Sequence, residues 1–149
     1  MSEHFKLFSA VFLIVKDEGG RMLVERRQNT GYMDNKLQPP VGHLNGAESA
    51  TDALAREAME ELGITINPQD LEFKHLEHKY FSNLEPVEYM NLFFKCKKWQ
   101  GEIKINEPEK CSEQLWLTPT EYINHPDSIP HVAKTIELID AGQVYSERA

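Results

Sequence analysis

The segment that most constrains how this chain folds is GHLNGAESATDALAREAMEELGI, residues 42–64, in which a loop rich in small residues leads into a predicted helix. Residues 48–62 combine strong helix formers with apolar residues at helical spacing. Gly63 follows, and glycine is the residue that best tolerates the left-handed backbone conformation after a helix end. A helix with such a defined end, placed between β-rich segments, restricts the chain to classes in which helices pack on a sheet.

β-rich segments lie on both sides of this helix and are bounded by turn residues. Their order predicts an α/β (α+β) fold with helices packed on a mixed sheet, formed by one domain over residues 1–149. The predicted strands are residues 5–17, 21–27, 71–81, 87–99 and 112–119, with a turn at 82–86 between the third and the fourth; residues 28–46 are a predicted loop, and 118–125 and 131–142 are predicted helices.

Composition excludes several classes of function. The formal net charge of −8 argues against a protein that binds nucleic-acid polymers, which needs a basic surface. It allows a nucleotide substrate, because a bound cation reverses the sign of a small site. No apolar run approaches the length of a membrane span and no secretory signal is evident, so we expect a cytoplasmic protein without a membrane partner. Cys96 and Cys111 lack metal-site spacing and are expected to be free thiols.

Three acidic residues share one face of the predicted helix. Glu57, Glu60 and Glu61 lie three and four positions apart, and like charges at these spacings repel by roughly a few tenths of a kcal/mol per pair. A solvated acidic face is one interpretation. The other is a metal site, because carboxylates provide the oxygen ligands that Mg²⁺ requires and the glycine at position 42 lets a backbone carbonyl approach closely.

Two further charges frame this face. Glu48 and Arg56 are eight positions apart, so they are predicted to pair and to anchor the loop against the helix. An ordinary surface ion pair is the alternative, and such a pair contributes little to stability. His43 directly follows Gly42 and is placed to touch a phosphate, although an exposed loop histidine is equally consistent with the sequence.

Gly42, Glu48 and the segment REAMEELGI at residues 56–64 resemble the complete Nudix box of the Nudix hydrolases. The chain is similar to MutT-like members over residues 8–117, through the segments ERR, NKL and the tryptophan and Gly-Glu pair of KKWQGEIKINEPEK. The resemblance implies the Nudix fold, a mixed β-sheet sandwiched between helices. It also implies hydrolysis of a nucleoside diphosphate linked to another moiety, with Mg²⁺ as the cofactor and Mn²⁺ as an alternative.

The resemblance also assigns roles to individual residues. It places an additional acidic residue at Glu107, with Glu102 and Glu109 as competing positions, and the phosphate-contacting arginine at Arg27. The implied metal ligands are the carbonyl of Gly42 and the carboxylates of Glu57, Glu60, Glu61 and Glu107. The implied catalytic residues are Glu60 and Glu107, and Arg27 and His43 are expected to bind substrate. Glu48, Arg56 and Gly63 are structural members of the motif.

The identity of the substrate stays open at this point. A nucleoside triphosphate is the first expectation, ADP-ribose or a nucleotide sugar the second, and a non-catalytic nucleotide-binding or regulatory domain the alternative from another class. Pro39 and Val87 stand where MutT carries an aromatic residue and an arginine near the base, so a preference for 8-oxoguanine nucleotides does not follow from the resemblance. Both a monomer and a homodimer agree with the sequence.

Overall fold

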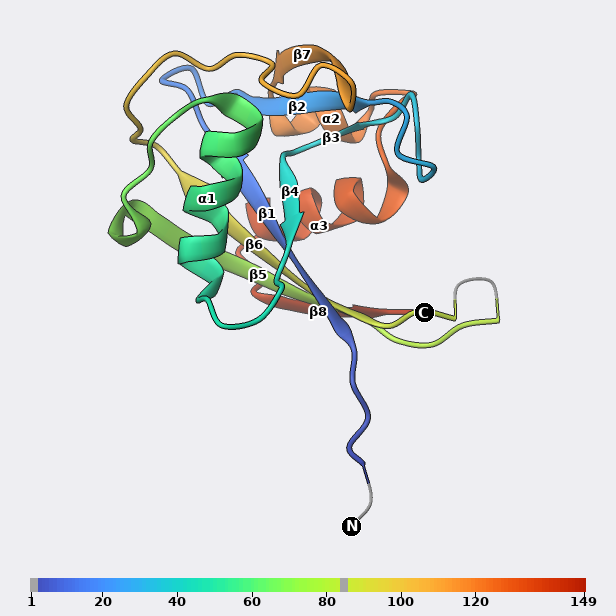
Figure 1. Cartoon of the computed structure of the whole chain (residues 1–149). Coiled ribbons are helices and arrows are strands. Elements are labelled where there is room, and N and C mark those ends of the chain that lie inside the picture. Colours follow the sequence, from blue (N-terminus) through green and yellow to red (C-terminus); the bar gives the residue numbers. More distant parts are fainter. Residues whose placement is uncertain (1–2, 84–85) are drawn as a thin grey trace.

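The computed structural model of the chain describes residues 3–83 and 86–149, which form two β-sheets with helices packed around them (Figure 1). The larger sheet has the strand order β4-β1-β6-β5-β8 and the smaller has the order β3-β2-β7. In chain order the elements are β1 Phe8–Val15, β2 Met22–Arg27, β3 Leu37–Gln38, β4 Val41–His43, α1 Ala50–Leu62, a 3₁₀ turn Pro68–Asp70, β5 Leu71–Lys79, β6 Tyr89–Cys96, β7 Cys111–Leu117, α2 Pro119–Ile123, α3 Pro130–Asp140 and β8 Tyr145–Arg148.

The five-stranded sheet is mixed. Strands β1 and β6 run parallel, as do β5 and β8, whereas β1–β4 and β5–β6 are antiparallel. Residues 10–15 of β1 are all buried, and a strand covered on both faces needs an unbroken apolar run. The sequence AVFLIV is therefore explained by the position of β1 inside the sheet and beneath helices on both sides.

Two apolar cores lie on opposite faces of this sheet. Phe12 and its even-numbered neighbours in β1 pack in one core with Val132 and Ile136 of α3. Leu13 and its odd-numbered neighbours pack in the other core with Leu54 of α1. Figure 1 shows α1 and α3 on opposite sides of the sheet, with the smaller sheet and α2 across one end. The predicted mixed sheet between helices is confirmed.

Helix α1 begins two residues later than the sequence predicts. Ser49 caps it, with its side chain accepting a hydrogen bond from the backbone N–H of Asp52, so Glu48 lies in the loop before the helix. Such a side-chain cap satisfies one of the free N–H groups at a helix start. Gly63 ends the helix with a φ of 71°, and its N–H is bonded to backbone carbonyls of the last turn, as predicted.

Other differences concern short strands and the number of sheets. The predicted loop at residues 28–46 contains β3 and β4, and the sequence analysis missed β8 entirely. Strands of two to four residues contain too little alternation to be recognised by pattern. The predicted strands at 21–27 and 112–119 pair with one another in a separate antiparallel sheet. Residues 84 and 85 of the turn predicted at 82–86 lie outside the described residues.

Cys96 and Cys111 are free thiols, as expected. None of the helices in the described part of the chain has the length and the apolar run needed to cross a bilayer.

A buried carboxylate fastens the C-terminal strand to the larger sheet. Glu77 of β5 is 2% exposed and accepts hydrogen bonds from Asn91 Nδ2 at 2.9 Å and from Arg148 Nε of β8 at 3.1 Å. His131 and Thr135 of α3 also contact it, at 3.2 and 3.3 Å. Burial opposes ionisation of Glu77, but the His131 and Asn91 contacts and the Arg148 charge outweigh it and lower the pKa of this carboxyl.

We expect Glu77→Gln to destabilise the fold by on the order of 3 kcal/mol at pH 7, because it removes the buried charge that the half-buried Arg148 guanidinium pairs with. Glu72→Gln on the same strand is the matched control and should have no measurable effect, since Glu72 pairs with Lys74 at the surface. Urea denaturation of the three proteins measures the difference.

The pH dependence of the same variant follows from the lowered pKa. The stability that Glu77 contributes is fully present above its ordinary pKa of 4.5 and is lost as the pH falls through the lower value in the folded protein. The difference between the wild type and Glu77→Gln should therefore shrink in acid. Equal stabilities at pH 7 would contradict the proposed anchoring role.

Candidate active site

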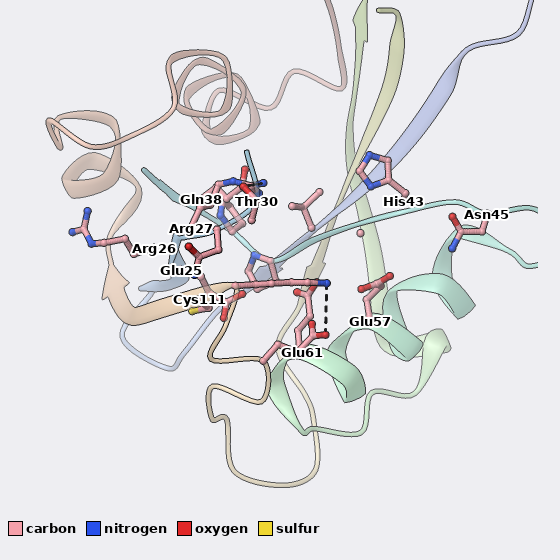
Figure 2. Close-up of a pocket in the computed structure, with 17 residues that line it drawn as sticks. Glu25, Arg26, Arg27, Thr30, Gln38, His43, Asn45, Glu57, Glu61 and Cys111 are labelled. Carbon is pink, nitrogen blue, oxygen red and sulfur yellow. Dashed lines mark hydrogen bonds and ion pairs between the residues drawn. The ribbon is translucent and has the colours of Figure 1, made fainter. Parts of the chain in front are cut away.

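A cavity of about 580 Å³ opens between α1 and the smaller sheet. Figure 2 shows Glu57 and Glu61 on α1 at one side of it, with Glu25 and Arg27 from β2 at the other. The residues around it come from β2, from the turn before β4, from β4 itself, from α1 and from the segment before β7; they include Glu25, Arg27, Thr30, Gln38, Pro39, Gly42, His43, Glu57, Glu61, Glu107, Lys110 and Cys111.

The three glutamates of α1 do not share one environment. Glu57 and Glu61 line the cavity one helical turn apart. The side chain of Glu60 is 51% exposed, lies outside the cavity lining and is paired with Arg56 at 3.4 Å. Glu107 joins Glu57 and Glu61 from the segment before β7, whereas neither Glu102 nor Glu109 lines the cavity.

Gly42 is required by close packing against α1. It lies in β4, opposite Val11 of β1, and a Cβ atom at this position would lie 2.4 Å from Cγ of Glu57. Any larger residue would have to push the Glu57 side chain away. The glycine of the motif therefore sets how closely the backbone of β4 approaches the carboxylate of the helix.

Arg56 links the loop before α1 to the helix. Its guanidinium binds the Glu48 carboxylate through two hydrogen bonds, Nη2–Oε1 at 2.7 Å and Nε–Oε2 at 3.2 Å. Its Nη1 also donates to Oε1 of Glu57 at 3.0 Å. The predicted pairing of Glu48 with Arg56 is confirmed, and its consequence is that Arg56 fixes the position of one carboxylate at the cavity.

Negative charge is concentrated inside the cavity. Burial, followed by the charges of Glu25, Glu57 and Glu107, raises the pKa of Glu61 to about 9. Glu25 is 9% exposed, and burial raises its pKa although Gln114 Nε2 donates a hydrogen bond to it at 3.2 Å. Carboxylates crowded in this way hold protons or cations more tightly than isolated ones.

Arg27 provides positive charge in the opposite wall. Its Nε donates to the carbonyl of Tyr32 at 2.8 Å and its Nη2 to Oγ1 of Thr30 at 2.9 Å, and the guanidinium lies 5.6 Å from the Tyr32 ring centre. Burial lowers the pKa of Arg27. Lys110 lies at the same cavity, 3.9 Å from Oε2 of Glu107.

The sequence predicts two further residues for this site, His43 and Gly63. His43 is exposed at the cavity, and its Nε2 lies 3.3 Å from the hydroxyl of Tyr89. Gly63 lies outside the cavity lining and serves as the end of α1. The structure thus brings Gly42, His43, Glu57, Glu61, Glu107 and Arg27 to one cavity and leaves Glu60 beside it.

Sequence reasoning missed Glu25, Gln38 and Lys110. Glu25 shares the face of Arg27 because the side chains of a strand alternate with a period of two, and this relation was the available signal. Gln38 lies opposite Glu25 in β3, in a segment predicted as loop. Nothing in the sequence distinguishes Lys110 from the other lysines of the chain.

The donor set fits a hard divalent cation. The cavity brings together carboxylates whose ionised form is disfavoured by burial and mutual repulsion, and Gly42 lies beside them. Hard cations bind oxygen ligands of this kind and keep several waters. Over residues 3–83 and 86–149, no group of three Asp, Glu, His or Cys side chains converges closely enough to form a ready cage. A cation bound here would take part of its oxygen shell from the backbone and from water.

Cys111 is predicted to be an unreactive thiol. Burial, followed by the charge and hydrogen bond of Glu25, raises its pKa from 9.0 to about 12, so its thiolate fraction at pH 8 falls on the order of a hundredfold or more. In a Cys96→Ser variant, labelling by a disulfide reagent should be correspondingly slower in the native protein than in urea. Equal rates in the two conditions would contradict the burial of this thiol.

Comparison with known proteins places the chain in a family. The model of the NUDIX domain matches residues 6–139. The 8-oxo-dGTP diphosphatase of Escherichia coli (strain K12) is 33% identical over 128 residues, which cover 84% of this chain and 93% of that protein. The Nudix hydrolase YfcD of the same strain is 31% identical over 131 residues, which cover 83% of this chain and 69% of YfcD.

A solved structure agrees with this assignment at the level of the fold. The MutT NUDIX hydrolase from Burkholderia pseudomallei has a TM-score of 0.76 and 16% identity, and the match covers 89% of this chain and 98% of that one. The matching family model, the two relatives and the cavity with its acidic helix lead to one conclusion: the chain belongs to the Nudix hydrolase family and is a MutT-like pyrophosphohydrolase.

Proposed function

We propose that this protein hydrolyses a nucleoside triphosphate at a phosphoric anhydride bond with Mg²⁺ as its cofactor and Mn²⁺ as a working substitute. One observation carries the proposal: a single cavity brings the carboxylates of Glu57, Glu61 and Glu107 together with the cationic side chains of Arg27 and Lys110. A polyphosphate with a bound cation has the complementary charges. The relative named 8-oxo-dGTP diphosphatase supports a nucleotide substrate.

The cation would be held by Glu57 and Glu61 together with the carbonyl of Gly42. Glu107, which lines the same cavity, and Glu60, which lies beside it on α1, are the further candidate ligands. When bound, the cation neutralises phosphate charge and makes water more acidic. Arg56 orients Glu57 through its 3.0 Å hydrogen bond and is in turn fixed by Glu48. This chain of contacts places one carboxylate before any ligand arrives, which reduces the cost of organising the site.

Glu107 is the proposed general base. It lines the cavity, its side chain is only 31% exposed, and a carboxylate in this position can accept a proton from an attacking water. Arg27 and His43 are the proposed phosphate-binding residues, because phosphoryl transfer depends on positioning and on neutralising the oxygens of the phosphates. Lys110 adds a second cationic group beside Glu107.

The proposal does not specify 8-oxoguanine as the nucleobase of the substrate. Pro39 lines the cavity without an aromatic ring to stack on a base, and Val87 provides no hydrogen-bonding side chain. The triphosphate moiety is therefore the part of the substrate that the structure supports best.

We expect Mg²⁺-dependent hydrolysis of nucleoside triphosphates in a panel that also contains ADP-ribose, nucleotide sugars and dinucleotides. Glu57→Gln should lower the rate by roughly tenfold to a hundredfold or more while leaving the melting temperature nearly unchanged. Glu18→Gln, at an exposed turn position, removes the same charge and should keep full activity. Phosphate or pyrophosphate release and thermal unfolding measure the two properties.

Two results of this panel would contradict the proposal. Turnover of ADP-ribose or a nucleotide sugar without turnover of triphosphates would assign another Nudix activity. A folded protein that hydrolyses no member of the panel would be a binding or regulatory domain instead.

Gly42→Ala gives a second test, directed at the geometry. The new methyl group would displace the Glu57 side chain, so we expect a loss of activity of on the order of tenfold or more with little loss of stability. Gly19→Ala is the control, because a Cβ at that exposed turn meets its nearest atom at 3.4 Å. Wild-type kinetics for Gly42→Ala would show that the position of Glu57 does not matter for turnover.

A further inference from the structure

On one face of strand β2, in the smaller sheet, a charged residue is buried next to an apolar one. Leu23 and Glu25 of β2 lie on the same face, and Leu23 is fully buried in the core that contains α1. Glu25 follows two residues later and is 9% exposed, so a carboxylate occupies a place next to an apolar core. Burying a carboxylate is costly unless a hydrogen-bonding or cationic partner compensates for it.

The neighbours of Glu25 provide hydrogen bonds but no positive charge. Its cross-strand neighbours are two neutral amides, Gln38 in β3 and Gln114 in β7, and Gln114 Nε2 donates a hydrogen bond to Oε2 at 3.2 Å. The Cys111 thiol provides a second hydrogen bond. Among residues 3–83 and 86–149, no Lys, Arg or His side chain forms an ion pair with it. Other carboxylates act on it instead: the charge of Glu107 helps to raise the pKa of Glu25, and the charge of Glu25 in turn helps to raise the pKa of Glu61.

Packing alone does not account for a glutamate at this position. A glutamine has the same shape, and it would accept the hydrogen bond from Gln114 without adding negative charge opposite Glu61. A glutamate at this position is favoured by a positive charge beside it, and the cationic side chains of the cavity are engaged elsewhere. Lys110 lies 3.9 Å from Oε2 of Glu107. Arg27, two residues further along the same strand, is directed to Tyr32 and Thr30 instead.

We infer that Glu25 is a further carboxylate of the cation site, which faces the helix carboxylates from the opposite wall of the cavity (Figure 2). It binds the cation or one of the waters in its shell on the side away from α1. The inference rests on the proposed function, because it assumes that the cavity binds a divalent cation. It assigns to the smaller sheet a part in cation binding, with Gln114 as the residue that orients Glu25.

The test is a titration of the full-length protein with Mn²⁺ in the absence of nucleotide, in which electron paramagnetic resonance measures the free ion. Glu25→Gln should weaken Mn²⁺ binding by about tenfold or more, whereas Glu18→Gln should bind as the wild type does. In chelator, the melting temperature of Glu25→Gln should be no lower than that of the wild type, because one of the opposed negative charges has been removed.

Unchanged Mn²⁺ affinity in Glu25→Gln would overturn the inference, and so would a lower melting temperature in chelator with unchanged affinity, which would mark a structural residue. Glu25→Asp provides a second variant if Glu25→Gln does not fold. It keeps the charge but shortens the reach of the carboxylate, and it should also weaken Mn²⁺ binding; wild-type affinity there would overturn the inference equally.

The two proposals fail in different ways. Binding of Mn²⁺ that depends on Glu25, in a wild-type protein that hydrolyses no nucleotide of the panel, would refute the proposed hydrolysis and keep the role of Glu25. Hydrolysis by the wild type together with unchanged Mn²⁺ affinity in Glu25→Gln would refute the role of Glu25 alone.

Discussion

The site depends on one guanidinium. Arg56 holds Glu48 of the preceding loop by two hydrogen bonds and Glu57 of its own helix by a third, so loop, helix and cavity wall are fixed to the same group. Planar guanidinium groups suit this task because they bind carboxylates in two parallel contacts. The remaining carboxylates of the cavity repel one another around this fixed point. A cation bound among them would offset this repulsion.

The features predictable from sequence were those encoded locally. Helix α1, its end at Gly63 and the pairing of Glu48 with Arg56 all depend on residues within one short segment, where spacing determines geometry. The buried strand β1 was also recognisable, because an unbroken apolar run is long enough to exceed chance. The cysteines could be predicted to be free from their spacing and from the expected compartment.

The features that were missed depend on contacts between distant segments. The sequence does not show that β2 pairs with β7 instead of joining the larger sheet, because both arrangements bury the same alternating residues. The environment of Glu25 depends on that pairing, since Gln114 and Glu61 reach it only in the folded chain. Glu60 shares the helical spacing of Glu57 and Glu61, but its side chain is paired with Arg56 and lies outside the cavity lining, a placement that spacing alone does not reveal.

The place of Gly42 in the larger sheet has a mechanical consequence. Gly42 is paired with Val11, in the middle of the strand that both cores enclose. Displacing that strand would open voids or create clashes in one of the cores. The wall of the cavity at Gly42 is therefore anchored to both cores through β1, and adaptation to different ligands falls to the loops and side chains elsewhere around the cavity.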